Sequence, residues 1–583
     1  MKNLRIQKSI RGGIFLFLFL LAIFFNASVI AQSPYFAWVK QAGGDYVDFG
    51  SSITTDRSNH IIITGLFRDT ANFDGNLLTS LGSFDIFVAI YDTLGNLGWL
   101  EREGGPDLEH GISITTDGSD NIFFTGHFWY SPIIAGTQLN TQNTLFDTAP
   151  DSEDIFIAKY YPIGFAGWQA DGSCHAGWDA SEFVYDIATD GDNNILITGG
   201  FGDSTRFHNC DFTNPQTLFS NSEYNDIFIA KYNEKREIMW AKKAGGTDKD
   251  WGEAICTDGS NNCIITGSFS GTAYFDGESV ISKGQEDIFI AKYSPAGQLM
   301  WITTAGGDSN DYVYDIALDG LGNIIITGSF RGTATFGLNT FTSFGNSDIF
   351  VAKYDNDGTG LWAKQAGGDS SDYGRSIATD ESGNIIVAAT SNGDVSFDDQ
   401  FIPGSFRNSD IFIAKYKPTG EVVWVKQVSR DYHEIDEVDI ATYGANNIYI
   451  TGSFKEANFD SIYVSAGADD IFLAKLIDTF DMPVISAQKV QKTFVLKQNY
   501  PNPFNTETEI VYQLSKDKYI TLSIYNLLGN KIQTLISCKQ RAGRYAVNWD
   551  GRDQAGQPVA SGMYLYRIVA GNYHATKKCL LLK

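Results

Sequence analysis

The heptapeptide Asp287-Ile288-Phe289-Ile290-Ala291-Lys292-Tyr293 recurs along the chain in near copies. At separations of 60 to 72 residues, the copies begin with Asp85, Asp154, Asp226, Asp287, Asp348, Asp410 and Asp470. A period of this size is typical of an array of supersecondary units, none of which can bury its apolar faces alone. The repeat as a whole, more than any single residue, therefore predicts the architecture.

Each repeat contains four strand-like runs, which in one unit are residues 376–379, 384–388, 410–416 and 422–426. A turn rich in Asp, Gly, Ser and Asn separates the first two runs, and these residue types favour tight hairpins. The second and third runs are apolar almost throughout, as at Ile324-Ile325-Ile326, so both faces of each sheet should be covered. Four-stranded sheets stacked face to face around an axis, as in a β-propeller, meet this requirement.

The two ends of the array predict how the ring closes. The chain enters with a fourth-strand sequence around Trp38 and leaves with a third-strand sequence, residues 470–476. Pairing these ends removes open strand edges, which otherwise promote aggregation. We therefore expect an all-β fold whose residues 32–476 form a seven-bladed β-propeller, with Phe36 to Gln41 paired to Ile471 to Leu476.

Three motifs recur in the units: the heptapeptide at residues 287–293, Trp-x-x-x-Ala-Gly-Gly at 362–368, and an Asp-x-x-Gly-Asn turn before Thr327-Gly328. On these motifs, residues 36–476 resemble the family of SBBP or β-propeller repeats, an architecture known mainly on exported proteins. Two units depart from the pattern, with Ala388-Ala389 in place of Thr-Gly and Tyr443 in place of the turn Asp. The resemblance implies the fold and does not identify a ligand.

The composition limits the classes of partner. The 583 residues carry a formal net charge of -26, although the segment from Lys489 onward has fourteen Lys and Arg against five Asp and Glu. An acidic body repels nucleic acid and anionic membranes, so we expect neither as a partner. Six cysteines in this length are too few for a disulfide scaffold. We expect a monomer.

The N-terminus is typical of a secretory signal peptide over residues 1–31. A basic segment precedes the apolar run from Ile14 to Phe25, and small or compact residues at Val29 and Ala31 predict cleavage after Ala31. No other run reaches the roughly 18 apolar residues that a transmembrane helix requires, so we expect no such helix in the mature chain.

Longer connections in the second and third repeats predict a ligand site on one rim of the propeller, because loops on a rigid scaffold tend to carry binding residues. The candidate binding residues there are His110, His127, Phe128, Trp129, Tyr130, His175, Trp178 and His208. They are consistent with a stacking platform for a sugar or polymer, with a histidine metal site, or with loop packing around a disulfide between Cys174 and Cys210.

Acids before the first strand of successive repeats suggest a second kind of site. They are Asp48, Glu109, Asp250, Asp311, Asp372 and Asp436. A partial ring of carboxylates could hold Ca²⁺, which takes six to eight oxygen ligands, and the alternative is a set of solvated loop residues. No Gly-x-Ser-x-Gly elbow or phosphate loop is present, so we assign no catalytic residue.

After a connector over residues 477–494, alternating strands over residues 495–583 predict a small immunoglobulin-like β-sandwich. The segments 499–504, 524–529, 561–567 and 577–583 carry a resemblance to the type A C-terminal sorting domain of the type IX secretion system, whose nearest structural relative is a FlgD-like immunoglobulin fold. Its sorting motif falls on Gly562, Tyr564, Lys577, Lys578 and Lys583. The resemblance implies contact with the type IX secretion machinery and passage through the outer membrane.

Together these patterns favour an exported protein, secreted or held on the outer-membrane surface after passing through the periplasm. We expect a non-enzymatic propeller that binds a glycan, polymer or surface protein at the rim of the second and third blades. A secreted polysaccharide lyase or hydrolase with its site in that rim is one alternative. A structural or adhesive surface component is another.

Overall fold

The computed structural model describes residues 34–129, 132–139, 153–163, 167–177, 181–220, 224–404, 409–430, 438–478, 495–499, 501–505, 507–514, 518–540, 543–555, 557–571 and 573–582. These residues form strands and turns without any helix, and accordingly none of them belongs to a helix able to span a membrane. The chain divides into two compact units, Met1–Met482 and Pro483–Lys583.

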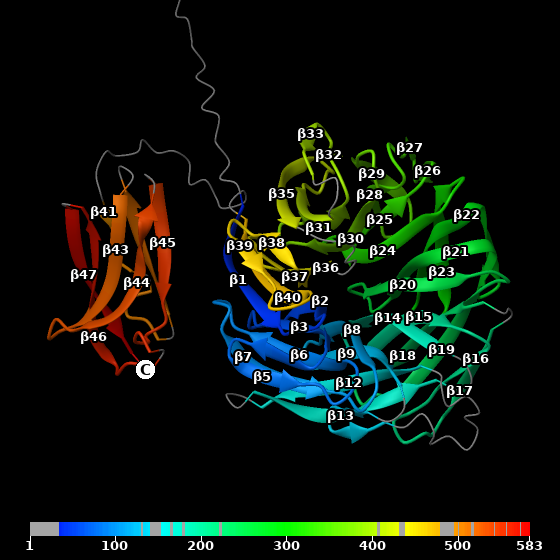
Figure 1. The fold of residues 1–583 in the computed structure, drawn as a ribbon, viewed down its shortest axis with the longest axis horizontal. Helices are drawn as coiled ribbons and strands as arrows, with labels where there is room; N and C mark the ends of the chain where they lie inside the picture. Colours follow the sequence, from blue (N-terminus) through cyan, green and yellow to red (C-terminus); the bar gives the residue numbers. More distant parts are fainter. Residues whose placement is uncertain are drawn as a thin grey trace, which may run out of the picture. The chain divides into compact units, whose positions relative to one another are not determined.

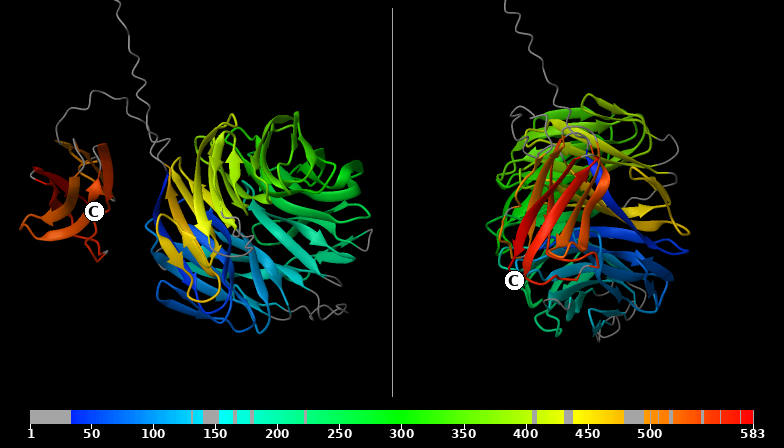
Figure 2. Two further views of the ribbon diagram at one scale, coloured as in Figure 1. Left: turned by 45° about the horizontal axis from the view of Figure 1, so that its top comes forward. Right: turned by 90° about the vertical axis from the view of Figure 1, so that its left-hand side faces the viewer.

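In the first unit the described strands group into seven antiparallel four-stranded blades (Figures 1 and 2). The first strands are β2 (Phe49–Thr55), β8 (Glu109–Thr116), β14 (Glu182–Thr189), β20 (Asp250–Thr257), β24 (Asp311–Leu318), β30 (Asp372–Thr379) and β36 (Val438–Tyr443). The second strands are β3 (Ile61–Phe67), β9 (Ile122–Phe128), β15 (Ile195–Phe201), β21 (Cys263–Phe275), β25 (Ile324–Phe330), β31 (Ile385–Ser391) and β37 (Asn447–Phe454). Neighbouring first strands contact one another in a closed ring, which surrounds the propeller axis.

The outer half of each blade contains the heptapeptide strand and a fourth strand. The third strands are β6 (Asp85–Tyr91), β12 (Asp154–Pro162), β18 (Asp226–Tyr232), β22 (Glu278–Tyr293), β28 (Asp348–Tyr354), β34 (Asp410–Tyr416) and β40 (Asp470–Ile477). The fourth strands are β7 (Leu97–Glu103), β13 (Trp168–Ala176), β19 (Ile238–Gly245), β23 (Leu299–Gly307), β29 (Gly360–Gly367), β35 (Val422–Arg430) and β1 (Tyr35–Gly43).

The predicted ring closure is confirmed. Strand β1 pairs antiparallel with β40, from Phe36 opposite Leu476 to Ala42 opposite Ile471. Figure 1 shows the two strands, from opposite ends of the array, side by side. The last blade therefore combines both ends of the array, and its fourth strand is the first strand of the chain.

The heptapeptide alternates between two apolar cores, which explains why it is apolar on both faces. Ile288 and Ile290 pack in one buried cluster, whereas Phe289 and Ala291 pack in another, and all four are fully buried. At the end of the strand the ammonium of Lys292 lies 2.8 Å from the carboxylate of the turn residue Asp258. Equivalent buried pairs join Lys231 to Asp190, Lys353 to Asp319 and Lys415 to Asp380.

In the seventh blade the turn residue is Tyr443 in place of Asp, so the heptapeptide lysine, Lys475, has no turn carboxylate to pair with. Lys475 donates to the carbonyl oxygen of Thr93 at 3.1 Å, and its ammonium lies 5.3 Å from the ring centroid of Tyr449. Lys353 makes the same kind of carbonyl contact, to Pro418 O, in addition to its ion pair, so the Tyr449 ring is the group that Lys475 contacts in place of a carboxylate.

Small hairpins occupy the connections between second and third strands, where the sequence analysis expected loops. They are β4 (Thr70–Phe73) with β5 (Asn76–Thr79), β10 (Ile133–Ile134) with β11 (Thr137–Gln138), β16 (Ser204–Phe207) with β17 (Gln216–Phe219), the outer halves of β21 and β22, β26 (Thr333–Phe336) with β27 (Asn339–Thr342), β32 (Val395–Phe397) with β33 (Gln400–Ile402), and β38 (Glu456–Asn458) with β39 (Ile462–Val464). Most of them pair with the end of the preceding blade's fourth strand, as where Ala366 and Gly367 face Phe397 and Ser396.

The Ala-Gly-Gly motif makes this contact between blades possible. A Cβ placed on the second glycine, Gly307, would lie 1.7 Å from the carbonyl oxygen of Thr333 in the next blade's hairpin. The first glycine, Gly306, has a φ of +133° and lies between the carboxyls of Asp287 and Asp311. Only glycine fits such close backbone approaches, so the motif is a junction sequence.

The acid at the start of each following first strand completes the junction. The Asp311 carboxylate accepts hydrogen bonds from the amide of Gly307 at 2.7 Å and from the amide of Arg331 at 3.2 Å. The same bond to the second glycine of the motif is made by Asp48, Glu109, Asp250 and Asp372. All five acids are fully buried, so they belong to the scaffold.

Burial without a cationic partner changes the protonation of these junction acids. Desolvation is the main cause that raises the pKa of Asp48, Asp250 and Asp311 to about 7, and that of Glu109 to about 8. The heptapeptide Asp of the preceding blade adds repulsion, as Asp287 does at Asp311. Each of these five junctions thus contains two neighbouring carboxyls that resist simultaneous ionisation.

The second unit is a sandwich of two antiparallel sheets. One contains β41 (Val495–Leu496), β42 (Thr508–Leu514) and β45 (Gly543–Trp549), and the other contains β44 (Lys531–Gln540), β43 (Lys518–Asn526), β46 (Gly562–Ala570) and β47 (Tyr573–Leu581). The core between them includes Tyr566, whose hydroxyl donates to Lys497 O and accepts from the Asn499 amide, both at 2.8 Å. The predicted immunoglobulin-like module is therefore present.

We expect Gly307→Ala to destabilise the propeller by about 1–3 kcal/mol, because the added methyl group overlaps the Thr333 carbonyl oxygen. The matched control is Gly320→Ala in the first turn of the next blade, where a Cβ meets nothing within 4 Å. Thermal unfolding of the two variants measures the effect. Equal melting temperatures would contradict the close-approach explanation of the motif.

The melting temperature should fall as the pH rises from about 4 to about 8. A carboxyl whose folded-state pKa is raised above its unfolded value stabilises the fold fully below the unfolded pKa, and this contribution is lost as the pH rises through the folded pKa. Thermal melts of the wild type and of Asp311→Asn test this, and the variant should show a shallower decline. Asp357→Asn, at an exposed turn, should leave the slope unchanged. A wild-type melting temperature that rises over this range would refute the expectation.

Candidate functional site

The acids that we considered as calcium ligands do not gather into a site. Each of the five described above lies at a separate blade junction and accepts hydrogen bonds from backbone amides, and Asp436 lies outside the described residues. No group of three or more His, Cys, Asp and Glu side chains suited to a metal ion occurs among the described residues. Their geometry is that of structural acceptors and gives the calcium hypothesis no support.

The rim residues of the second and third blades fall into two groups of contacts. His110 and His127 face each other on β8 and β9 with ring centroids 5.4 Å apart, and His127 contacts Phe183. His175 instead contacts Phe128 and His208. Cys174 and Cys210 form a disulfide beside this second group.

Burial keeps these histidines neutral. Desolvation lowers the pKa of His110 to about 4 and those of His127 and His175 to about 3, and it also lowers the pKa of His208. Trp129 is partly exposed at the rim, whereas Tyr130 and Trp178 lie outside the described residues. The described part of the rim therefore consists of packed, uncharged side chains.

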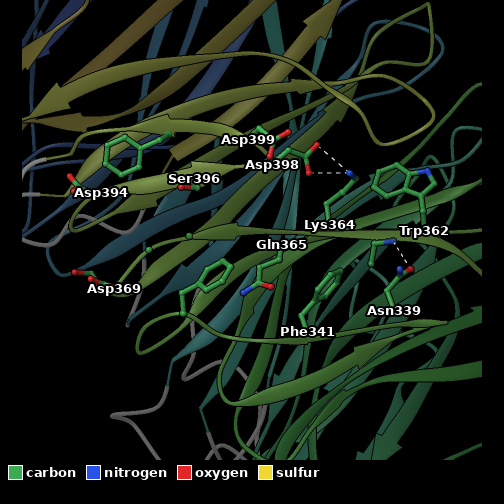
Figure 3. A pocket seen from close by; sticks show the side chains of 16 residues that line it. Asn339, Phe341, Trp362, Lys364, Gln365, Asp369, Asp394, Ser396, Asp398 and Asp399 are labelled. Carbon is green, nitrogen blue, oxygen red and sulfur yellow. Dashed lines mark hydrogen bonds and ion pairs between the residues drawn. The ribbon is translucent and has the colours of Figure 1, made fainter.

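A groove of about 1140 Å³ lies between the hairpins β26–β27 and β32–β33, with β29 as its floor (Figure 3). Its aromatic residues are Phe341, Phe344, Trp362 and Phe401, and its acids are Asp369, Asp394, Asp398 and Asp399. Lys364 forms an ion pair with Asp398 at 3.0 Å, and Asn339 Oδ1 accepts from the Ala363 amide at 3.1 Å. The groove is open and its polar groups are partly engaged with one another.

A pocket of about 420 Å³ opens between the first strands of the fifth and sixth blades, and we call it the mouth pocket. Its lining residues are Asn310, Tyr312, Tyr314, Ser329, Arg331, Asn346, Ser347, Tyr373, Arg375, Thr390, Asn392 and Ser409. Tyr314 and Arg375 also line a smaller cavity of about 220 Å³, which is bordered by all seven first strands. The mouth pocket thus adjoins this axial cavity at Tyr314 and Arg375.

A β-bulge at Tyr314 in β24 and another at Arg375 in β30 place these two side chains in the mouth pocket. Tyr314 and Tyr373 have ring centroids 6.4 Å apart, and the Arg375 guanidinium carbon lies 5.1 Å and 4.4 Å from these two rings. Nε of Arg375 donates to Thr390 Oγ1 at 3.1 Å, which fixes the plane of the guanidinium. Burial raises the pKa of Tyr314 above its usual value.

Below the mouth pocket, a ring of Ser and Asp side chains joins the blades. Asp439 accepts from the Ile53 amide at 2.8 Å, and Asp315 accepts from the Ile377 amide at 2.7 Å, each bond reaching the next blade. Ser376 Oγ lies 2.8 Å from Asp315 Oδ2 and 2.6 Å from Asp439 Oδ1. The single hydroxyl hydrogen of Ser376 can be donated to only one of these carboxyls at a time, and burial raises the pKa of both.

Sequence reasoning missed the mouth pocket because the fifth and sixth repeats have connections of ordinary length. The available signal was side-chain type at equivalent positions of the first strand. At this position the seven repeats have Ser51, Ile112, Tyr185, Glu253, Tyr314, Arg375 and Val438, and only the fifth and sixth repeats place a tyrosine next to an arginine. Variation at a channel-facing position was a better indicator than loop length.

Comparison with known proteins supports the repeat assignment and the C-terminal module. Residues 361–395 match the family model described as β-propeller repeat, and residues 505–573 match the model described as FlgD Ig-like domain. The chain is 24% identical over 566 residues to an uncharacterized WD repeat-containing protein, L264, of Acanthamoeba polyphaga mimivirus, covering 80% of this chain and 40% of that protein. The chain thus spans less than half the length of this relative.

Similarity to solved structures is weak. A fungal alcohol oxidase of the AA5 family in complex with copper aligns with a TM-score of 0.37 at 9% identity, over 95% of this chain and 100% of that one. PorZ, described as a surface component of the type IX secretion system of Porphyromonas gingivalis, aligns with a TM-score of 0.17 at 10% identity, over 93% of this chain and 100% of that one. The family matches alone show that the chain contains a β-propeller repeat and a FlgD Ig-like domain.

Proposed function

We propose that this protein is exported and acts outside the cell or on its surface as a non-enzymatic binding protein, with the mouth pocket as its ligand site. The observation that carries the proposal is the convergence of three tyrosines, two arginines and several amides and hydroxyls on one preformed pocket of about 420 Å³. Small-ligand pockets are usually of this size and combine aromatic surface with a few polar groups. A saccharide fits this combination, because tyrosine rings offer an apolar face and a polar edge.

The protonation of the pocket favours binding over catalysis. Burial is the main cause that raises the pKa of both Tyr312 and Tyr314, so neither phenol supplies a base near neutral pH. The carboxylates of Asp315 and Asp439 below the pocket accept hydrogen bonds from neighbouring blades and hold the ring together. The groups in the pocket thus suit recognition of a ligand.

Export rests on the two ends of the chain. The N-terminal signal-like segment implies translocation into the periplasm. The C-terminal module, with Gly562, Tyr564, Lys577 and Lys578 on its paired strands β46 and β47, implies sorting through the outer membrane by the type IX machinery. Lys577 and Lys578 occupy consecutive positions of β47, and the Lys578 side chain is exposed, as a receptor-read signal requires.

We expect Tyr314→Ala and Tyr373→Ala to weaken glycan binding about tenfold or more, equivalent to about 1.4 kcal/mol or more, because each removes a stacking face from the mouth pocket. The measurement is a glycan array with the purified mature chain, followed by calorimetry on the best ligand. Trp129→Ala, at the predicted rim site, is the control and should change affinity less than twofold. If only the Trp129→Ala variant loses binding, the ligand binds at the rim of the second and third blades and the mouth-pocket proposal is wrong.

Removing residues 577–583 should abolish surface display and leave the protein in the periplasm, because the deletion removes half of β47 from its pairing with β46. Lys577→Ala with Lys578→Ala tests the signal while keeping the strand. The control is Lys531→Ala with Lys539→Ala at exposed positions of the same module. Protease accessibility on intact cells that carry the type IX machinery reports display. Normal display of the truncated chain would refute the sorting role.

A further inference from the structure

Two rings of hydrogen bonds join the first strands of neighbouring blades, and we call each contact between two such strands a seam. The first ring, the Ser–Asp ring, lies below the mouth pocket. Its side chains occupy one position of the first strand and bond a group of a neighbouring blade, as Asp186 does with the Ile255 amide at 2.8 Å. The members of the ring are Ser52, Ser113, Asp186, Asp315, Ser376 and Asp439. The fourth blade has Ala254 at this position, which has no polar side-chain atom.

The second ring, the Thr ring, lies at the ends of the same strands. Each threonine hydroxyl donates to the carbonyl oxygen of the equivalent residue in the preceding blade, as Thr257 does to Thr189 O at 2.7 Å. The members are Thr55, Thr116, Thr189, Thr257, Thr379 and Thr442. The fifth blade has Leu318 here, so no hydroxyl is available for Thr257 O.

Both interruptions fall at the same seam, between β20 of the fourth blade and β24 of the fifth, which contact each other (Figure 1). The Ile316 amide, equivalent to the Ile255 amide, donates to Asp315 of its own strand at 2.7 Å. Ala254 and Ile316 belong to one buried apolar cluster, and Leu318 packs against it. The inner strands of this seam are therefore held by apolar packing, whereas the other six seams have bonds of both rings.

The seam beside the ring closure is different, although the two ends of the propeller chain meet in its seventh blade. Four side-chain hydrogen bonds cross it to the first blade. They are Asp439 with the Ile53 amide at 2.8 Å, Thr55 with Thr442 O at 3.4 Å, Tyr443 with Arg57 O at 2.9 Å, and Tyr449 with Asn59 at 3.0 Å. The closure of the chain is thus well fastened.

The polar contacts that do cross the seam between the fourth and fifth blades involve the outer strands of the fourth blade. The Trp301 indole nitrogen on β23 donates to Asn356 O at 3.2 Å, and Glu286 on β22 hydrogen-bonds the Tyr312 hydroxyl. The Ala-Gly-Gly junction also joins the end of β23 to the start of β24. The seam is therefore fastened on its outer side and lacks ring bonds on its axial side.

We propose that the propeller opens at this seam, with β20 and β24 separating on the axial side while the outer contacts act as the hinge. Local opening occurs where the fewest hydrogen bonds must break. The next seam keeps the bonds from Asp315 to the Ile377 amide and from Thr379 to Leu318 O, so the mouth pocket stays intact. The axial cavity, which Ala254 lines, gains a side opening. This inference does not depend on the proposed function.

Two native thiols report the opening. Cys256 on β20 packs against the apolar cluster shared by the fourth and fifth blades, whereas Cys263 on β21 belongs to the cluster shared by the third and fourth. The test measures alkylation of each thiol in the purified mature chain under native conditions, by mass spectrometry of its peptides. We expect Cys256 to react at least ten times faster than Cys263, because only its seam opens.

Variants separate opening from static exposure. Ala254→Ser with Leu318→Thr supplies the residue types of the other seams and should slow alkylation of Cys256 at least fivefold, with Cys263 unchanged. Ala254→Ser alone, beside the axial cavity, should give part of this effect and serves as the test if the double variant does not fold. The control is Thr116→Val, which removes a bond of the Thr ring between the first and second blades and should leave the Cys256 rate unchanged.

Three results would overturn the inference. Equal rates for Cys256 and Cys263 would show that this seam opens no more than its neighbour. A fast Cys256 whose rate is the same in the wild type and in the Ala254→Ser variants would show that the reagent reaches the thiol without separation of the strands. A Cys256 rate that rises in Thr116→Val would show that the ring loosens as a whole.

Discussion

The propeller depends on the junction at which one blade's fourth strand meets the next blade's hairpin. At Gly307 two backbones approach too closely for any side chain, and Gly306 has a positive φ and lies between the carboxyls of Asp287 and Asp311. Asp311 of the following blade accepts the Gly307 amide. One short sequence thereby joins three segments: the end of a fourth strand, a hairpin, and the start of the next first strand. Repetition of this junction around the ring sets the spacing of the blades, because each blade is fixed to its neighbour through the same backbone hydrogen bonds.

The junction also explains the apolar character of the heptapeptide. Once neighbouring blades are held face to face, both sides of every third strand are covered, and Ile288 and Phe289 can be buried in different cores. Polar residues at the ends of this strand then need partners of their own. Asp287 accepts from the Lys283 amide at 2.9 Å, and Lys292 pairs with Asp258. Each residue type in the motif Asp-Ile-Phe-Ile-Ala-Lys-Tyr is therefore explained by the surroundings of that position: apolar where the side chain enters a core, and charged where it meets a polar partner.

Strand order and ring closure could be predicted from the sequence, because they follow from the period and from the incomplete units around Trp38 and residues 470–476. The small hairpins could not, since a run such as Thr333–Phe336 is four residues long and as polar as a loop. The acids illustrate the same limit. In the sequence, Asp48 and Glu109 lie in glycine-containing connections, where acids are usually solvated. In the structure they are buried, because the preceding blade and a segment some twenty residues further along the chain cover them.

The location of the candidate site follows from how a repeat protein can acquire specificity. Residues that hold the ring, such as Ser376 and Asp439, cannot vary without loss of bonds between blades. In the fifth and sixth blades, Tyr312 and Tyr373 near the start of the first strands line the mouth pocket. At the equivalent positions the other blades have Phe49, His110, Phe183 and Trp251. Substitutions at these positions can therefore create a ligand site at one side of the mouth. They break the pseudo-symmetry of the scaffold without any change in loop length. The longer connection after β15 in the third blade shows the converse. Its Cys210 is joined by a disulfide to Cys174 of β13, and its His208 packs against His175, so irregular length can serve packing as readily as recognition.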